Sequence, residues 1–397
     1  MKQKLVLAFS GGLDTSYCVK YLADKGYEVH SALVDTGGFS DEELKRIEDR
    51  AKYLGVASHI TLNLADKFYQ DCIKYLIFGN ILKNNTYPLS VSAERIFQAV
   101  AIAEYSKKIG AKAIAHGSTG AGNDQVRFDM AFAIIYPEAE IITPIRDEKL
   151  SRQEEIDYLK KHGIEGNYDK AMYSINQGIW GTSVGGKETL TSKNYLPESA
   201  FPTQVSKTGE EVLEMEFSKG ELCGVNGEKF KNPVDAIKKI SSIAAPYGIG
   251  RDIHVGDTII GIKGRVGFEA AGPVVILKSH HLLEKHTLTK WQMYWKEQLS
   301  TWYGNLLHEG QYMDPVMRNI EVFLQDTQKN VTGKVWVHLS PYNFYVQGIE
   351  SAHDLMASKA GQYGEMNNSW SGDDVRGFSK IAAMQNIIYY KVNGENK

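Results

Sequence analysis

Short apolar runs alternate with amphipathic stretches through the first part of the chain. The apolar run over residues 5–9 predicts a buried strand, and the helical spacing over residues 14–25 predicts a helix that stops at Gly26. Residues 27–34 and 56–62 predict two more strands. Strands that alternate with helices indicate βαβ units, and therefore an α/β fold with a mostly parallel sheet and helices on both faces.

Further helices are expected around these strands. Ser40 and Glu43 form a capping box that opens a helix, which reaches Leu54 before Gly55. Glycine, Asn and Asp residues mark a domain boundary near residues 165–170. The other elements predicted before this boundary are helices over residues 66–78 and 92–109, a strand over residues 111–115, and a helix that Ser151 and Glu154 cap and that ends near His162.

Beyond the boundary the pattern becomes that of a mixed α+β domain. Polar and apolar residues alternate over residues 212–217, which predicts a strand, and Asn226-Gly227 is a hairpin signal. Residues 378–390 predict a terminal amphipathic helix, which packs either on another subunit or on its own domain. The remaining predicted elements are a helix over residues 233–243 and strands over residues 258–263 and 274–277.

Composition narrows the classes of function. Lys and Arg total 45 against 48 Asp and Glu, a net charge of −3, so no global positive field favours nucleic acid as a partner. The 3 cysteines lack metal-ligand spacing, which indicates neither a disulfide framework nor a zinc site. Since no run approaches about 18 apolar residues and no signal segment is apparent, we expect a soluble, cytoplasmic protein with no membrane partner.

The strongest local motif follows the first strand and reads Phe9-Ser10-Gly11-Gly12-Leu13-Asp14-Thr15-Ser16. The glycines let a ligand approach the backbone, and the free amides at the start of the next helix favour an anion. This predicts a phosphate cradle. Asp14 would repel a bare phosphate, but it fits if Mg²⁺ bridges its carboxylate to phosphate oxygens. The alternative is a glycine turn whose polar residues merely cap the helix.

This loop matches neither common nucleotide fingerprint, G-x-G-x-x-G or the P-loop. Residues 181–187 reproduce the glycine and lysine spacing of a P-loop, but Glu188 stands where a magnesium-binding hydroxyl is required. No strong apolar strand precedes the segment, so we do not expect a P-loop there.

A second polar segment runs from His116 to Asp129, between a strand and a predicted helix. Because ligands in parallel sheets bind beyond the carboxyl ends of the strands, both polar segments are expected to face one crevice. Arg127 has the fork geometry that suits a carboxylate, and Asp124 suits an ammonium, so the pair predicts a site for a zwitterionic amino acid. The alternative is a solvated loop with a surface ion pair.

These residues resemble the argininosuccinate synthases, which belong to the N-type ATP pyrophosphatases. The resemblance extends over essentially the whole chain. It implies a nucleotide-binding domain of the adenine nucleotide alpha hydrolase type at residues 1–167, an α+β synthetase and multimerisation domain at residues 168–362, and a C-terminal arm with an oligomerisation helix at residues 363–397. The motifs that carry it are the residue 10–16 loop, Tyr87-Pro88-Leu89, the segment from Gly117 to Arg127, and Tyr173-Ser174 with Trp180-Gly181-Thr182-Ser183.

The resemblance also implies the ligands and their residues. ATP is expected at Ala8, Phe9, Ser10, Gly11, Gly12, Leu13, Asp14, Thr15, Ser16, Val34 and Gly117, with Asp14 also placed for a phosphate-bound Mg²⁺. Aspartate is expected at Thr119, Asn123 and Asp124, with Arg95 as a further partner for a carboxylate. Citrulline is expected at Tyr87, Ser92, Asn123, Arg127, Ser174 and Ser183.

Two positions depart from the family pattern. Gly256 and Phe268 stand where the family has a citrulline-contacting Glu and a Tyr. Asp257 or Glu269 is a candidate to replace the missing carboxylate from an adjacent position. Otherwise the substrate would be a citrulline with a less charged amine, such as an N-acylated one, because a buried ammonium without a partner is unfavourable.

The implied reaction is an ATP-dependent ligation in arginine biosynthesis. The ureido oxygen of citrulline attacks the α-phosphate, pyrophosphate leaves, and the amine of aspartate displaces AMP to give argininosuccinate. The family also implies a homotetramer. The alternatives are a ligase for an N-acylated citrulline, an inactive nucleotide-binding or amino-acid-binding homologue, and a tRNA-thiolation or glutamine-dependent enzyme. The last pair requires reactive cysteines or a glutaminase domain, which the chain does not suggest.

Two other clusters predict structural roles. His280, His281 and His286 with Glu284 fit no metal-binding spacing, so we expect structural or surface histidines. A group of aromatic residues is expected to form the packing face of a helix and not a platform for bases. Its members are Trp291, Tyr294, Trp295, Trp302 and Tyr303.

Overall fold

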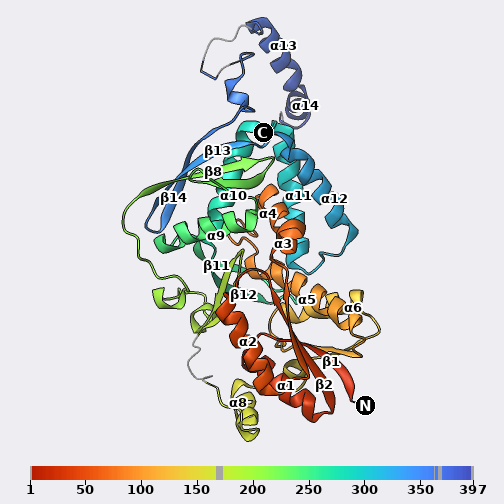
Figure 1. Ribbon diagram of the computed structural model, residues 1–397. Helices are drawn as coiled ribbons and strands as arrows, with labels where there is room; N and C mark the ends of the chain where they lie inside the picture. Colours follow the sequence, from red (N-terminus) through yellow and green to blue (C-terminus); the bar gives the residue numbers. More distant parts are fainter. Residues whose placement is uncertain (1, 167–172, 362, 365–368, 395–397) are drawn as a thin grey trace.

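The computed structural model describes residues 2–166, 173–361, 363–364 and 369–394 of the chain, and its described strands form three sheets (Figure 1). The first sheet is wholly parallel and has the order β3-β2-β1-β4-β5. Its strands are β1 (Gln3–Ala8), β2 (Tyr27–Asp35), β3 (Ser58–Asn63), β4 (Ala113–Ala115) and β5 (Glu140–Ile142). The predicted α/β class with a parallel sheet is confirmed.

Helices cover both faces of this sheet, because alternate strand residues are apolar on each side. Leu5 and Leu7 face a core formed with α1 (Leu13–Asp24), α2 (Asp41–Leu54) and α8 (Arg152–Lys161). Val6 faces a second core formed with α5 (Ser90–Lys108) and α6 (Asp124–Ile135). The loops that follow β1, β2 and β4 therefore emerge together at one edge of the sheet.

The residues predicted to begin and end helices do so. The Ser40 hydroxyl accepts a hydrogen bond from the amide of Glu43, and the Ser40 amide donates to the Glu43 carboxylate in return. Ser151 forms the same capping box with Glu154. Gly55 ends α2 in the left-handed conformation at φ 84°. Short helices complete this half: α3 (Ala65–Phe68), a π-helical turn (Tyr69–Ile73), α4 (Lys74–Phe78) and α7 (Pro144–Asp147).

The later part of the chain contains two antiparallel sheets. One has the order β10-β9-β8-β13-β14, with β8 (Glu211–Ser218), β9 (Glu221–Val225), β10 (Glu228–Lys229), β13 (Gly333–Ser340) and β14 (Asn343–Glu350). The other has the order β11-β12-β7-β6, with β6 (Ser174–Gly178), β7 (Gly181–Gly185), β11 (Arg251–Asp257) and β12 (Lys263–Glu269). The helices that pack around them are α9 (Pro233–Ala244), α10 (Ala271–Thr287), α11 (Lys290–His308) and α12 (Pro315–Thr327).

Two predicted strands are wrong. Residues 258–261 form the turn between β11 and β12, where Gly261 adopts φ 84° and the amide of Ile262 donates to the Thr258 hydroxyl. Ile260 is exposed and Ile259 is only half-buried, so the pattern did not reflect burial. Residues 274–277 lie within α10, where their β-branched side chains pack in one cluster with buried residues of α9, α11, α12 and β8. We call this cluster of buried residues the main core. Tertiary packing therefore overrides their strand propensity.

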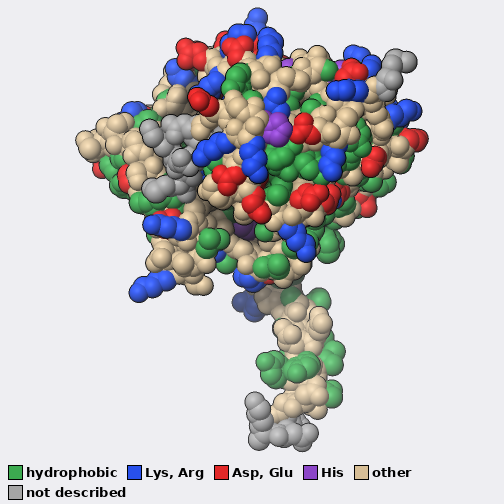
Figure 2. Space-filling model, turned by 90° about the horizontal axis from the view of Figure 1, so that it is seen from below, with side chains coloured by type: hydrophobic (Ala, Val, Ile, Leu, Met, Phe, Trp, Pro, Cys, Tyr) green, Lys and Arg blue, Asp and Glu red, His purple; other side chains and the backbone are tan. Residues whose placement is uncertain are grey.

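The C-terminal segment is helical, as predicted, but it forms two helices, α13 (Gly372–Ala382) and α14 (Met384–Asn393). Neither helix has a buried residue, and both extend away from the body of the molecule (Figure 1). Figure 2 shows this arm from another side, with hydrophobic side chains along its surface.

The aromatic residues of α11 do not form the expected packing face within this chain. Tyr303 is buried in the main core. The other four, Trp291, Tyr294, Trp295 and Trp302, are each more than half exposed. They lie on the outer side of the helix, because the inner side is formed by residues such as Leu307 and Ser300.

Candidate active site

A cleft of about 1020 Å³ opens at the carboxyl edge of the parallel sheet. Residues from the loops after β1 and β4 line it, together with residues of α5, α6, α8 and β6. A β-carbon at Gly117 would lie 3.4 Å from the β-carbon of Asp14 and 3.5 Å from a methyl of Thr15. The two polar segments predicted to face one crevice therefore do converge.

The glycine loop keeps its donors open to this cleft. Gly11 adopts φ 77°, a conformation that favours glycine, and Gly12 is the extended N-cap of α1 without a side-chain cap. The hydroxyls of Ser10 and Thr15 lie 3.4 Å apart. The first amides of α1 thus point to the space where an anion is expected, with two hydroxyls beside them. Ser16 differs, because it is fully buried and its hydroxyl has no partner among the described residues.

Asp14 shares its site with a second carboxyl group. Burial raises the pKa of Asp14, and burial together with the neighbouring Asp14 raises the pKa of Glu155. The closeness of the two carboxyls disfavours the ionisation of both at once. Arg152 opposes both shifts with its positive charge, and it lines the cleft with Arg50. These two cations reduce the negative charge beside the glycine loop.

His116 holds the loop that follows β4 in place. Its Nε2 lies 2.9 Å from Asp129, and the amide of Ser118 donates to its Nδ1 at 3.2 Å. Asp129 in turn accepts from Arg146 at 2.6 Å. The imidazole is fully buried at the end of β4, so it ties the loop that contains Gly117 to α6 and α7.

Asp124 is held between two guanidinium groups. Arg95 Nε donates to its Oδ2 at 3.0 Å and Arg127 Nη1 donates to its Oδ1 at 2.9 Å. Burial acts to raise the pKa of Asp124, but the two cations outweigh it and hold this pKa below the usual range. Arg95 also donates to Asn176 of β6 at 2.6 Å. Asp124 is therefore an ionised carboxylate at the cleft wall.

All three nitrogens of the Arg127 guanidinium group already donate to protein acceptors. Its Nε and Nη2 donate to the backbone carbonyl of His308 at 3.1 and 2.9 Å. This carbonyl belongs to the last turn of α11, whose unpaired oxygens attract a cation. Arg127 thus joins the end of α11 to Asp124, and its contact with a ligand carboxylate stays a prediction.

The predicted site residues fall into two groups. The cleft is lined by Arg95, Thr119, Asp124 and Ser174, and by all the residues expected to hold ATP except Ser16. The other group lies away from the cleft lining and comprises Tyr87, Ser92, Asn123, Arg127 and Ser183. Of these, Tyr87 packs against Phe268 with ring centroids 5.3 Å apart, and Ser183 pairs with Phe268 across β7 and β12.

Neither candidate carboxylate replaces the acid missing at Gly256. Glu269 is buried and accepts from Arg251 at 3.1 Å, while Asp257 is exposed and pairs with Lys263 at 2.5 Å. Both charges are compensated within the protein, so this expectation is wrong. Register explains it, because residues 257 and 269 point away from the side of the hairpin on which Gly256 and Phe268 lie.

Several residues at these sites could not be identified from the sequence. Arg50 and Arg152 line the cleft but lie in ordinary charged helices, where no motif distinguishes them. Lys83 and His254 lie near Tyr87, and only the fold brings them there.

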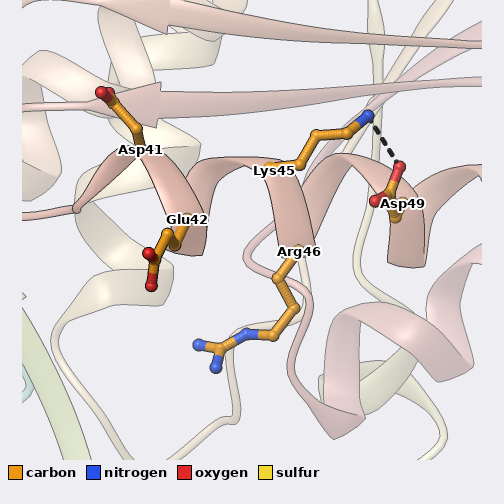
Figure 3. A pocket seen from close by; sticks show the side chains of 5 residues that line it. All are labelled: Asp41, Glu42, Lys45, Arg46 and Asp49. Atoms are coloured by element: carbon orange, nitrogen blue, oxygen red, sulfur yellow. Dashed lines mark ion pairs between the residues drawn. The ribbon is translucent and has the colours of Figure 1, made fainter.

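A second hollow lies on the outer face of α2 and carries only exposed charges (Figure 3). Lys45 pairs there with Asp49 at 2.9 Å, and Arg46 points away from this pair. Exposed pairs one helical turn apart contribute little to stability, so we assign this surface no site.

Comparison with known proteins places both parts of the chain in one family. Residues 4–165 match the family described as "Arginosuccinate synthase N-terminal HUP domain", and residues 173–389 match "Arginosuccinate synthase C-terminal domain". The chain is 38% identical to the argininosuccinate synthase of Methanocaldococcus jannaschii over 98% of both chains. It is 35% identical to that of Dictyoglomus thermophilum, over 100% of this chain and 99% of the relative. No helix among the described residues is long and apolar enough to cross a membrane.

Proposed function

The chain belongs to the argininosuccinate synthase family, and on this premise we propose how its residues join citrulline to aspartate. The protein is a citrulline–aspartate ligase of arginine biosynthesis. Neither the N-acylated substrate nor the inactive homologue gains support from its relatives. The site residues divide among the three substrates: those for ATP and aspartate mostly line the cleft, whereas Ser174 is the one citrulline residue that lines it among the described residues.

The glycine loop holds the polyphosphate of ATP. The amides at the start of α1 and the hydroxyls of Ser10 and Thr15 surround the pyrophosphate that leaves when the citrulline oxygen attacks the α-phosphate. Val34 and Gly117 lie at the same cleft and contact the adenosine. Donors fixed before the reaction stabilise the charge that develops on the leaving group.

Arg50 and Arg152 supply positive charge at this end of the cleft. The loop itself offers only neutral donors and Asp14, so the departing pyrophosphate needs cations from elsewhere. Mg²⁺ is the other expected source. Asp14 is the cleft carboxyl that would hold it, and no group of three possible ligands exists among the described residues. The ion would therefore rely mainly on phosphate oxygens and water, as Mg²⁺ commonly does, and would neutralise phosphate charge.

Aspartate binds at the loop that begins α6. The ionised Asp124 faces its ammonium, Thr119 adds a hydroxyl, and Arg95 offers positive charge to a carboxylate. Citrulline is held by Tyr87, Ser92, Asn123, Arg127, Ser174 and Ser183, of which Ser174 lines the cleft. Holding both amino acids and ATP in line recovers much of the entropy cost of bringing them together.

We also propose a homotetramer, a three-part organisation at residues 1–167, 168–362 and 363–397, and a cytoplasmic location. The support for assembly is the arm of α13 and α14, whose apolar residues such as Phe378 and Ile381 are exposed. The exposed aromatic side of α11 supports it as well. Apolar surface of this extent is typical of an interface.

The observation that carries this proposal is the meeting of the glycine loop with the Gly117 loop in one cleft. Its test is pyrophosphate release from ATP with citrulline and aspartate, together with a Gly12→Val variant. We expect release only with both amino acids, and a loss of turnover in the variant. Full turnover by Gly12→Val would exclude the glycine loop as the pyrophosphate site.

A further inference from the structure

The ring of Tyr87 has a neighbour that none of the assigned residues includes. His254 of β11 lies nearly parallel to it, with ring centroids 5.2 Å apart and planes at 27°. Phe268 packs on Tyr87 as well, at 5.3 Å. The imidazole therefore has a fixed orientation beside a residue proposed to bind citrulline.

His254 is buried, but one of its ring nitrogens lacks a hydrogen-bond partner among the described residues. The residue is 5% exposed, and its Nδ1 has no hydrogen-bond partner among the described residues. Buried polar atoms almost always have partners, because leaving one unpaired costs free energy. An unpaired ring nitrogen next to a binding residue points to a partner that arrives with the ligand.

The ring can occupy this position only because residue 256 is glycine. A β-carbon at Gly256 would lie 2.7 Å from Nε2 of His254 and 3.4 Å from Nδ2 of Asn84. The imidazole thus occupies the space that a side chain at residue 256 would otherwise fill. His254 and Gly256 form a matched pair: Nε2 of the ring lies in the space of a side chain at residue 256, and Nδ1 is the ring nitrogen that has no partner among the described residues.

Two asparagines hold the β11–β12 hairpin over this region. Asn84 Nδ2 donates to the carbonyl of Val255 at 3.1 Å, and the amide of Ile259 donates to Oδ1 of Asn123 at 2.8 Å. Asn123 is itself proposed to contact citrulline. The hairpin that contains His254 is therefore fixed to the citrulline side of the site at two points, Val255 in β11 and Ile259 in the turn that follows it.

Lys83 sets the charge of this region. Its ammonium donates to Oδ1 of Asn305 at 3.0 Å and is close enough to act on His254. Burial first, and then the charge of Lys83, lowers the pKa of His254, so the imidazole is neutral at physiological pH and retains an acceptor nitrogen. The carboxylates of Glu309 and Asp257 act on Lys83 as counter-charges.

We propose that His254 and Lys83 form the subsite for the amino-acid head group of citrulline. Nδ1 of His254 accepts a hydrogen bond from the α-ammonium, and the ammonium of Lys83 faces the α-carboxylate. The inference rests on the proposed function, since it assumes that citrulline reaches Tyr87. It makes His254 a determinant of specificity for a free amine.

The test compares two substitutions of His254 with a matched control. His254→Phe keeps the ring against Tyr87 but removes its nitrogens, and His254→Asn restores an amide near the position of Nδ1. His286→Phe is the control, because it removes a half-buried imidazole that pairs with Asp354 elsewhere. KM and kcat are measured for citrulline, aspartate and ATP by pyrophosphate release. Thermal melting checks the fold of each variant.

We expect His254→Phe to raise the KM for citrulline roughly 10- to 100-fold, since one hydrogen bond to a charged group is lost. The KM values for ATP and aspartate should not change, and His254→Asn should recover part of the loss. The amine-free analogue 5-ureidopentanoate, used as an inhibitor against citrulline, should bind the wild type and His254→Phe equally. Lys83→Met should weaken both citrulline and this analogue, because both carry the carboxylate.

An unchanged citrulline KM in His254→Phe would overturn the proposal. An equal loss of affinity for citrulline and for 5-ureidopentanoate would overturn it as well, because the amine would then not be the group recognised. If the analogue inhibits neither protein, the citrulline KM alone decides. A wild type that releases no pyrophosphate with citrulline and aspartate would instead contradict the proposed function, which keeps the two failures distinct.

Discussion

The carboxyl group of Glu94 lies directly against the backbone of Gly178, so that a β-carbon at residue 178 would overlap both carboxyl oxygens. Glu94 belongs to α5 in the first half of the chain, and Gly178 begins the turn between β6 and β7 in the second half. This contact, with the Arg95–Asn176 hydrogen bond beside it, joins the two halves behind the cleft.

A Gly178→Ala substitution should therefore destabilise the protein. The added methyl group must displace a buried carboxyl or shift the β6–β7 turn, and overpacking of this kind costs about 1–3 kcal/mol. Urea unfolding measures the change. Gly209→Ala is the control, because nothing lies within 4 Å of a β-carbon at that glycine. Equal unfolding midpoints for the two variants would contradict the close contact.

Glu94 also predicts how stability depends on pH. Burial raises its pKa to about 8, above the usual 4.5, although Arg95 opposes the shift. The folded state therefore binds the proton more tightly than the unfolded chain, so this contribution to stability is complete below pH 4.5 and is lost as pH rises through about 8.

A Glu94→Gln variant removes this titration while keeping the shape of the side chain. We expect its melting temperature to rise relative to that of the wild type as pH increases from 6 to 9, and this difference isolates Glu94 from other titrating groups. A difference that stays constant over that range would show that Glu94 does not ionise there.

A buried ion pair gives a third prediction. Lys296 Nζ lies 2.7 Å from Glu284 Oε2 and 2.8 Å from the carbonyl of Phe78, and both charged side chains are fully buried. Lys296→Met leaves the carboxylate without its cation and should cost about 3–5 kcal/mol. Lys334→Met, which breaks a half-exposed pair with Glu214, should cost about 1 kcal/mol or less.

Chemical denaturation of both variants measures these two costs. The double variant Lys296→Met with Glu284→Gln should recover part of the loss, because the uncompensated charge is then absent. If Lys296→Met and Lys334→Met prove equally mild, the buried pair contributes no more than a surface one.

The features that sequence predicted are those encoded within a few residues. The Ser40–Glu43 box, the helix end at Gly55 and the Gly11-Gly12 turn each depend on neighbours in the chain, and each forms as expected. The alternation of strands and helices also gave the parallel sheet, since its periodicity reflects burial on both faces.

The features that sequence could not predict depend on distant contacts. Residues 274–277 have the composition of a strand, yet packing in the main core keeps them in α10. His254 meets Tyr87 only because β11 and the segment before α5 pack together, although the two residues are 167 positions apart in the chain. No local pattern marks such a pair.

We expect substitutions on the exposed apolar face of α13 to impair assembly. Phe378 and Ile381 of α13 are 74% and 76% exposed, on a helix without any buried residue. Phe378→Asp with Ile381→Asp should leave the body folded but reduce the proposed homotetramer to smaller species, because burying unpaired carboxylates in an interface is unfavourable. Light scattering after size exclusion measures the mass. Asp373→Asn on the same helix is the control, and equal masses for the two would exclude this face from the interface.

Arg152 provides the sharpest test of the proposed chemistry. It lines the cleft from the first turn of α8, and its charge acts on the Asp14–Glu155 pair beside the glycine loop. If it stabilises the departing pyrophosphate, Arg152→Ala should lower kcat by about 10-fold or more while the KM values for citrulline and aspartate stay the same. Arg152→Lys should retain part of the rate, because it keeps the charge but loses the fork. Arg46→Ala on α2 is the matched control, since that side chain is 77% exposed and does not line the cleft (Figure 3). If Arg152→Ala raises only the KM for ATP, Arg152 instead acts in ground-state binding. An interaction made equally in the ground state and in the transition state changes affinity and not turnover.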